Sequence, residues 1–208
     1  YIAMHYKLTE EILNLSESKE WDFAKLEWSF EFAYYAEELQ KCLCGHYPIK
    51  NICVIKNRRN SSVTEVGNCC INKFLGIDEG NKIFSSIKKL KDSETASMSS
   101  EVIEYIYKKK GISDFEYNFY KSIYRKRIMS DKQWDIKKRI NHKFLNFTRY
   151  ETNSHFNKIN LVLKWAQTNI SFNTDFVLSI KECCQKNGRL TEKQLESLNK
   201  IISSFKIQ

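Results

Sequence analysis

Cysteine and histidine residues in the first half of the chain have the types and spacing of a metal site. Cys42, Cys44 and His46 occupy alternate positions in KCLCGHYPIK, and EVGNCC places Cys69 and Cys70 about 25 residues later. A structural zinc ion takes four thiolate or imidazole ligands in a tetrahedron, and such ligands usually come in local pairs. We therefore predict a structural zinc site formed by Cys42, Cys44, Cys70 and His46.

Two alternatives to this ligand set remain open. Cys69 competes with Cys70 for the helical position, and Cys53 competes with His46 for the fourth position. Cys53 faces the same way as Ile55 if the segment is a strand with alternating side chains, which favours a core role. If no metal binds, these cysteines are small buried residues and the histidine is a surface residue.

The segments around the cysteines predict the elements that position them. Residues 52–55 and 63–66 are short β-favouring runs separated by the polar stretch KNRRNSS, so a β-hairpin is expected. After Gly67, the sequence NCCINKFL has helical spacing. A cysteine knuckle, a hairpin and a helix with cysteine in its first turn are typical of a treble-clef or zinc-ribbon-like module, here residues 41–76.

The rest of the chain predicts a mainly α fold. It holds 1 proline and 6 glycines, too few turn signals for an all-β sandwich. ISDFE, MSDKQ and LTEKQ each combine a capping hydroxyl with Glu or Gln three residues later. We expect related helical hairpins at residues 100–147 and 175–207, with Gly111 and Gly188 as left-handed caps of the preceding helices.

The N-terminal segment also reads as helix. Trp21, Trp28 and Tyr35 recur every seven residues, and the first 40 residues carry a net charge of −6. The predicted organisation is listed by segment: an acidic helical segment at 1–40, the zinc module at 41–76, a basic helical hairpin region at 77–150 and a C-terminal helical hairpin at 151–208.

Positive charge is concentrated in the middle of the chain. Residues 105–150 carry a net charge of +9, equal to that of the whole protein, and their basic side chains alternate with aromatic ones. Cations that neutralise phosphates and aromatic faces that stack on bases are the ingredients of nucleic-acid binding. The predicted phosphate contacts are Arg58, Arg59, Arg125, Lys126, Arg127, Lys137, Lys138 and Arg139.

Composition also bears on the compartment. The chain has no apolar run long enough to span a membrane, and its N-terminus lacks the pattern of a secretory signal. Its 7 cysteines are odd in number and clustered, which suits reduced thiols in the cytoplasm better than a disulfide framework. In the pair Cys183 and Cys184, we expect one buried helix residue beside a half-exposed one.

Few residues suggest catalysis. Glu65 is the only acid in the zinc module, and His142, Asn153 and His155 lack the strand hairpin of a histidine-asparagine nuclease site. No glycine-rich phosphate loop is present, so no small-molecule cofactor is implied. We expect a non-enzymatic nucleic-acid-binding or assembly protein. The alternative is an adaptor or inhibitor that binds an acidic surface of a host protein; a metal-dependent hydrolase is the third possibility.

The run CLCGHYPIKNICVIKN followed by EVGNCCINKFLGI resembles a segment of short, functionally unassigned proteins of bacteria and their phages. The shared pattern is Cys-x-Cys-Gly-His/Lys, then Val-Gly-x-x-Cys-Ile/Val-x-x-Phe. The resemblance implies a phage or mobile-element character and favours Cys70 over Cys69 as a ligand, but it implies no reaction. Because the pattern admits Lys at position 46, the fourth ligand stays open between His46, Cys53 and Cys69.

Overall fold

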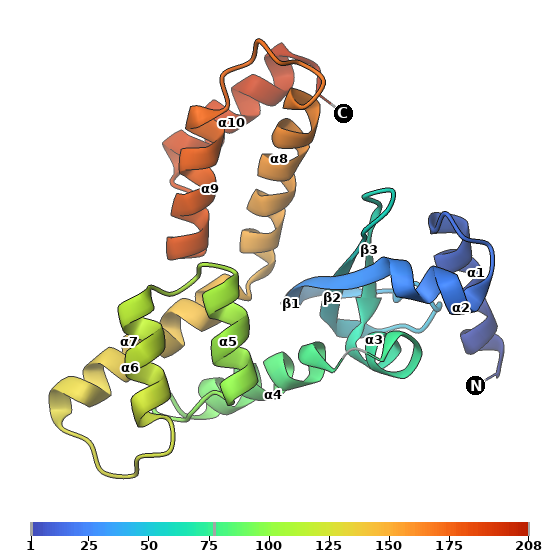
Figure 1. The fold of residues 1–208 in the computed structure, drawn as a ribbon. Helices are drawn as coiled ribbons and strands as arrows, with labels where there is room; N and C mark the ends of the chain where they lie inside the picture. Colours follow the sequence, from blue (N-terminus) through green and yellow to red (C-terminus); the bar gives the residue numbers. More distant parts are fainter. Residues whose placement is uncertain (1, 77, 208) are drawn as a thin grey trace. The chain divides into compact units, whose positions relative to one another are not determined.

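The computed structural model describes residues 2–76 and 78–207, which form two compact units, Tyr1–Lys88 and Lys89–Gln208. It is mainly helical with one small antiparallel sheet, as the composition predicted (Figure 1). None of the described helices is both long and apolar enough to cross a membrane.

The first unit begins with helix α1 (Ile2–Leu15), which buries Leu8 and Ile12. These residues are four apart and therefore lie on one face of the helix. The short helix α2 (Trp21–Ala24) and the 3-10 turn η1 (Lys25–Glu27) follow. The prediction of helix is thus correct for Ile2–Leu15 and Trp21–Ala24.

Beyond this turn the helix prediction is wrong. Residues Trp28–Gln40 form the long strand β1, which pairs antiparallel with β2 (Ile49–Asn57). The aromatic residues at positions 28, 30, 32 and 34 also follow the two-residue period of a strand, and aromatic side chains favour strands. Pairing with a distant segment decides between the two periods. One extra residue between Phe30 and Phe32 makes a bulge in β1.

The predicted hairpin is present. Strand β2 pairs with β3 (Val63–Gly67), and the sheet has the order β1-β2-β3. At the hairpin turn, the Asn57 side chain accepts hydrogen bonds from the backbone amides of Arg59 and Asn60, at 2.8 and 3.2 Å. This side chain mimics a backbone turn, so Asn57 directs the chain from one strand into the next.

Helix α3 (Asn68–Leu75) follows β3 directly and packs on β2 and β3 (Figure 1). It ends at Gly76, whose φ of +65° is left-handed. Helix α4 (Glu79–Asp92) brings Gly80 so close to Cys53 that an added Cβ would lie 2.6 Å from the sulfur. Cys53 is therefore enclosed in the core, as its place on the strand predicted.

The second unit consists of helices joined by short turns. Its elements are α5 (Ser100–Lys108), α6 (Asp114–Ile123), α7 (Asp131–Phe147), α8 (Tyr150–Ala166), α9 (Asp175–Asn187) and α10 (Glu192–Ser204). All three predicted capping boxes are present, at Ser113, Ser130 and Thr191. These signals are local, so they act regardless of what the helix packs against.

The two predicted glycine caps differ in outcome. Gly188 has a φ of +71° and ends α9, as expected. After α5, the left-handed residue is Lys110, with a φ of +58°, and not Gly111. An added Cβ on Gly111 would lie 2.7 Å from a side-chain carbon of Ile106, so this glycine serves close packing instead.

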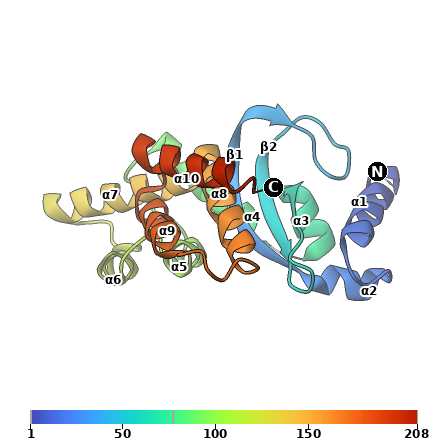
Figure 2. The same ribbon diagram turned by 90° about the horizontal axis from the view of Figure 1, so that it is seen from above.

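Helices α8, α9 and α10 enclose an apolar core (Figure 2). Its buried members include Ile159, Val177, Ile180 and Leu198. Cys184 is also in this core and is fully buried, whereas Cys183 is partly exposed, which confirms the expectation for that pair.

Candidate metal centre

The turn between β1 and β2 brings two cysteines together. The backbone amide of Gly45 donates to the carbonyl of Cys42 at 2.8 Å, and the amide of Cys42 donates to the carbonyl of His46 at 2.9 Å. Gly45 has a φ of +90°, a conformation that residues other than glycine rarely adopt. This knuckle buries both Cys42 and Cys44, each 4 % exposed.

Cys70, in the first turn of α3, completes a cluster of three sulfur atoms. The Sγ atoms of Cys42, Cys44 and Cys70 all lie within 4.8 Å of one another, and those of Cys42 and Cys70 are 3.5 Å apart. Zn–S bonds of about 2.3 Å in a tetrahedron place two sulfur atoms about 3.8 Å apart. The three cysteines could therefore hold a metal ion without a large movement of the backbone.

The electrostatics of the cluster favour a cation. The hydrogen bond with Cys70 lowers the pKa of Cys42, helped by the amide of Gly67, which donates to Cys42 Sγ at 3.2 Å. The same hydrogen bond, with burial, raises the pKa of Cys70, and burial raises that of Cys44. Without a cation the cluster favours one thiolate; a bound cation would stabilise all three.

The other candidate ligands lie outside this cluster. His46 is exposed, and no group of three ligand atoms in residues 2–76 and 78–207 includes it. Cys69 is exposed next to Cys70. Burial raises the pKa of Cys53 to about 12, so this thiol stays protonated in the core. The structure thus brings together three of the four predicted ligands.

Comparison of the sequence with family models gives no match, and no curated protein or solved structure is significantly similar to this chain.

The residues predicted to contact phosphates differ in their exposure to solvent. Arg58 and Arg59 are exposed at the tip of the hairpin, and Arg125, Lys126 and Arg127 are exposed in the turn after α6. On α7, Arg139 is exposed and Lys138 is half-buried.

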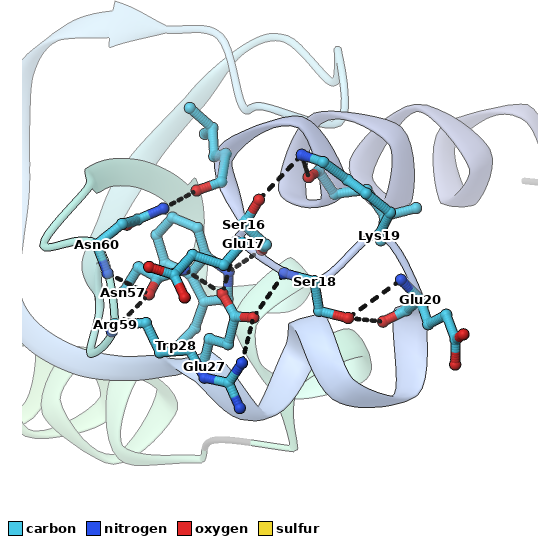
Figure 3. A network of polar contacts seen from close by, with 12 residues as sticks. Ser16, Glu17, Ser18, Lys19, Glu20, Glu27, Trp28, Asn57, Arg59 and Asn60 are labelled. Carbon is cyan, nitrogen blue, oxygen red and sulfur yellow. Dashed lines mark hydrogen bonds and ion pairs between the residues drawn. The ribbon is translucent and has the colours of Figure 1, made fainter.

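Arg59 forms an ion pair with the buried carboxylate of Glu27. Glu27 is 3 % exposed and accepts hydrogen bonds from the amides of Glu17 and Ser18 and, at 2.7 Å, from Asn57 Nδ2 (Figure 3). Nη1 of Arg59 lies 3.7 Å from Oε1 of the same carboxylate. The side-chain hydrogen bond from Asn57 is the largest of the effects that lower the pKa of Glu27. This network connects the α1–α2 turn to the hairpin.

The prediction that Lys137 contacts phosphates is wrong, because this lysine is buried. Its side chain is 2 % exposed, and Nζ donates to the carbonyl of Thr95 at 2.7 Å and to the hydroxyl of Ser97 at 2.8 Å. Nζ also lies 5.0 Å from the ring centre of Trp134. Because its donors are directed into the protein, Lys137 holds the 93–99 segment and is not available to a ligand. Burial lowers its pKa.

The residues of the nuclease alternative have other roles. His155 is buried, and its Nδ1 accepts a hydrogen bond from the amide of Leu190 at 3.1 Å. His142 is exposed on α7, with Nε2 3.6 Å from a carboxylate oxygen of Glu94. Within the described part of the chain, neither histidine belongs to a group of three potential metal ligands.

Proposed function

We propose that the protein is a non-enzymatic nucleic-acid-binding protein whose first unit is stabilised by a structural zinc ion. In this proposal Cys42, Cys44 and Cys70 hold the ion, with His46 as the fourth ligand. Support for His46 comes from its backbone, which is hydrogen-bonded to Cys42.

A structural role is favoured by what surrounds the sulfur atoms. The cluster joins the knuckle to α3, two segments far apart in the sequence, which is what structural zinc sites do. Glu65, the acid of the module, accepts a hydrogen bond from the Tyr34 hydroxyl at 3.0 Å. A zinc that activates water would need a base near the open position, and the cluster of Cys42, Cys44 and Cys70 contains no carboxylate.

The observation that carries nucleic-acid binding is the division of charge between the units. Residues 89–208 hold 23 basic and 13 acidic side chains, a net charge of +10, whereas residues 1–88 have 11 and 12, a net charge of −1. The entire positive excess therefore lies on the helical unit. A field of this sign attracts phosphate backbones and raises association rates.

Fluorescence anisotropy with labelled single-stranded and duplex DNA and RNA tests this proposal. We expect binding that weakens steeply as salt increases, because counterions are released from the nucleic acid, and that unlabelled nucleic acid of unrelated sequence competes away. The proposal is wrong if none of these probes binds at low salt.

A further inference from the structure

An open groove lies within the second unit, between the α5–α6 turn, α7 and the C-terminal end of α9. It has a volume of about 750 Å³. Its lining includes basic side chains from three separate segments, namely Lys108, Lys110, Arg139, Lys143 and Lys186. Lys186 is far from the others in the sequence, and only the packing of α9 brings it to them.

The two acidic residues of the groove are already engaged. Asp114 accepts a hydrogen bond from the Tyr107 hydroxyl at 3.0 Å. Glu116 accepts from the amide of its capping residue Ser113 at 2.9 Å and forms an ion pair with Lys143 Nζ at 2.7 Å. The charge of Glu116 is therefore paired within the protein, whereas Asp114 keeps its negative charge, and with five basic and two acidic side chains the lining has a net charge of +3.

Four cations remain for a ligand. Lys108, Lys110 and Lys186 are exposed, as is Arg139, and none of the four forms an ion pair with a carboxylate of residues 2–76 or 78–207. Four like charges around one groove repel one another unless an anion lies between them. The groove therefore favours a ligand with several negative charges.

Aromatic side chains accompany these cations. Phe115, in the first turn of α6, lines the groove and is 63 % exposed, and its ring stacks on that of Phe119 with centroids 6.1 Å apart. Tyr107 also lines the groove, and its ring stacks on Tyr117 at 4.2 Å. Phe115 thus presents an exposed apolar ring to the groove, and the ring of Phe119 packs against it.

We infer that this groove binds a single-stranded nucleic acid, with phosphates at Lys108, Lys110, Arg139 and Lys186 and a base stacked on Phe115. The inference deepens the proposed nucleic-acid-binding function and rests on it. A groove of about 750 Å³ has the size of a small-ligand site and accommodates a few nucleotides. Paired bases keep their faces stacked inside a duplex, whereas single-stranded bases can stack on an exposed ring.

The test compares two quadruple variants with equal changes in charge. The groove variant combines Lys108→Gln, Arg139→Gln and Lys186→Gln with Lys110→Asn, because Asn tolerates the left-handed backbone at that position. The control variant is Lys132→Gln, Lys193→Gln, Lys200→Gln and, at a left-handed position like that of Lys110, Lys206→Asn; all four residues are exposed, lie outside the groove and are not among the predicted phosphate contacts. Binding of a labelled oligothymidylate of about 15 nucleotides is measured over a salt series.

We expect the groove variant to bind at least about tenfold more weakly and to lose about two to three from the slope of log K against log salt, since each contact to a single strand contributes about 0.7. The control variant should lose less than about threefold. Phe115→Leu should weaken binding about fivefold or more, and Phe115→Trp should retain it.

Each other outcome has a distinct meaning. Equal losses in the two quadruple variants would overturn the groove and leave the proposed function standing. A duplex that competes as well as the single strand would overturn the single-strand assignment. Absence of binding by the unaltered protein would overturn both proposals. Circular dichroism and thermal unfolding of each variant confirm that it is folded.

Discussion

The sulfur atoms of Cys42 and Cys70 lie 3.5 Å apart, although 28 residues separate them in the chain. The knuckle supplies one and the first turn of α3 supplies the other, so the contact depends on the hairpin between them. A metal ion bound here would connect the two ends of that hairpin.

We predict one zinc ion per chain, lost in Cys70→Ser and retained in Cys69→Ser. The neighbouring cysteines form a matched pair, because only Cys70 belongs to the sulfur cluster and Cys69 is exposed. His46→Ala should retain less zinc in competition with a chelator. Elemental mass spectrometry on protein purified without chelators measures the metal content. A metal-free wild-type protein, or equal loss in Cys69→Ser, contradicts the site.

The Glu27 network predicts a large difference between two partners in one ion pair. Glu27→Gln should lower the urea midpoint of unfolding more than Arg59→Gln does. Glu27 is buried and accepts hydrogen bonds from two backbone amides and from Asn57, whereas the Arg59 side chain is 58 % exposed and its pairing is screened by solvent. Glu37→Gln, at an exposed position, serves as the control. Equal effects of Glu27→Gln and Glu37→Gln would refute a structural role for the network.

Variants of Lys137 and of its neighbour Lys138 distinguish a lysine with a structural role from one with a predicted binding role. Lys137→Met should reduce the free energy of unfolding by about 1–3 kcal/mol, because the buried carbonyl of Thr95 loses its donor. Lys138→Met, at a half-buried position, should change it by less than about 0.5 kcal/mol. Lys137→Met should change nucleic-acid affinity by less than about twofold at constant salt, whereas Lys138→Met, which removes a predicted phosphate contact, should weaken binding and reduce its salt dependence. Urea unfolding and anisotropy measure the two properties; a larger effect of Lys137→Met on affinity than on stability contradicts this interpretation.

His155 predicts a dependence of stability on pH. Burial lowers its pKa below the usual 6.5, so the unfolded chain takes up a proton more readily than the folded one. The contribution of this group is complete above pH 6.5 and decreases as the pH falls towards the folded-state pKa, because protonation also removes the acceptor of the Leu190 amide. In His155→Gln this part of the pH dependence should disappear, whereas His142→Gln, at an exposed position, should retain it. Unfolding free energies measured from neutral to acidic pH test this; parallel curves for the wild type and His155→Gln contradict it.

Local signals in the sequence determined much of the helical unit. A capping box at Ser113, Ser130 or Thr191 uses atoms within four residues of each other, so it defines a helix start whatever the helix packs against. Likewise, the turn residues around Asn57 encode the hairpin, and Gly45 encodes the turn that carries Cys42. The cysteine spacing predicted Cys42 and Cys44 as ligands but left Cys69 as an alternative to Cys70, and the structure places Cys70 in the sulfur cluster.

Other features were decided only by tertiary structure. Trp28–Gln40 carries both a seven-residue and a two-residue pattern, and hydrogen bonds to β2 select the strand. Lys137 resembles the neighbouring basic residues Lys138 and Arg139 in sequence, yet its direction on α7 buries it beneath the 93–99 segment. Lys186 reaches the basic groove because α9 packs in the same unit as α5, α6 and α7. In each case the partner lies far away in the chain, and a local pattern cannot specify which distant segment will be adjacent.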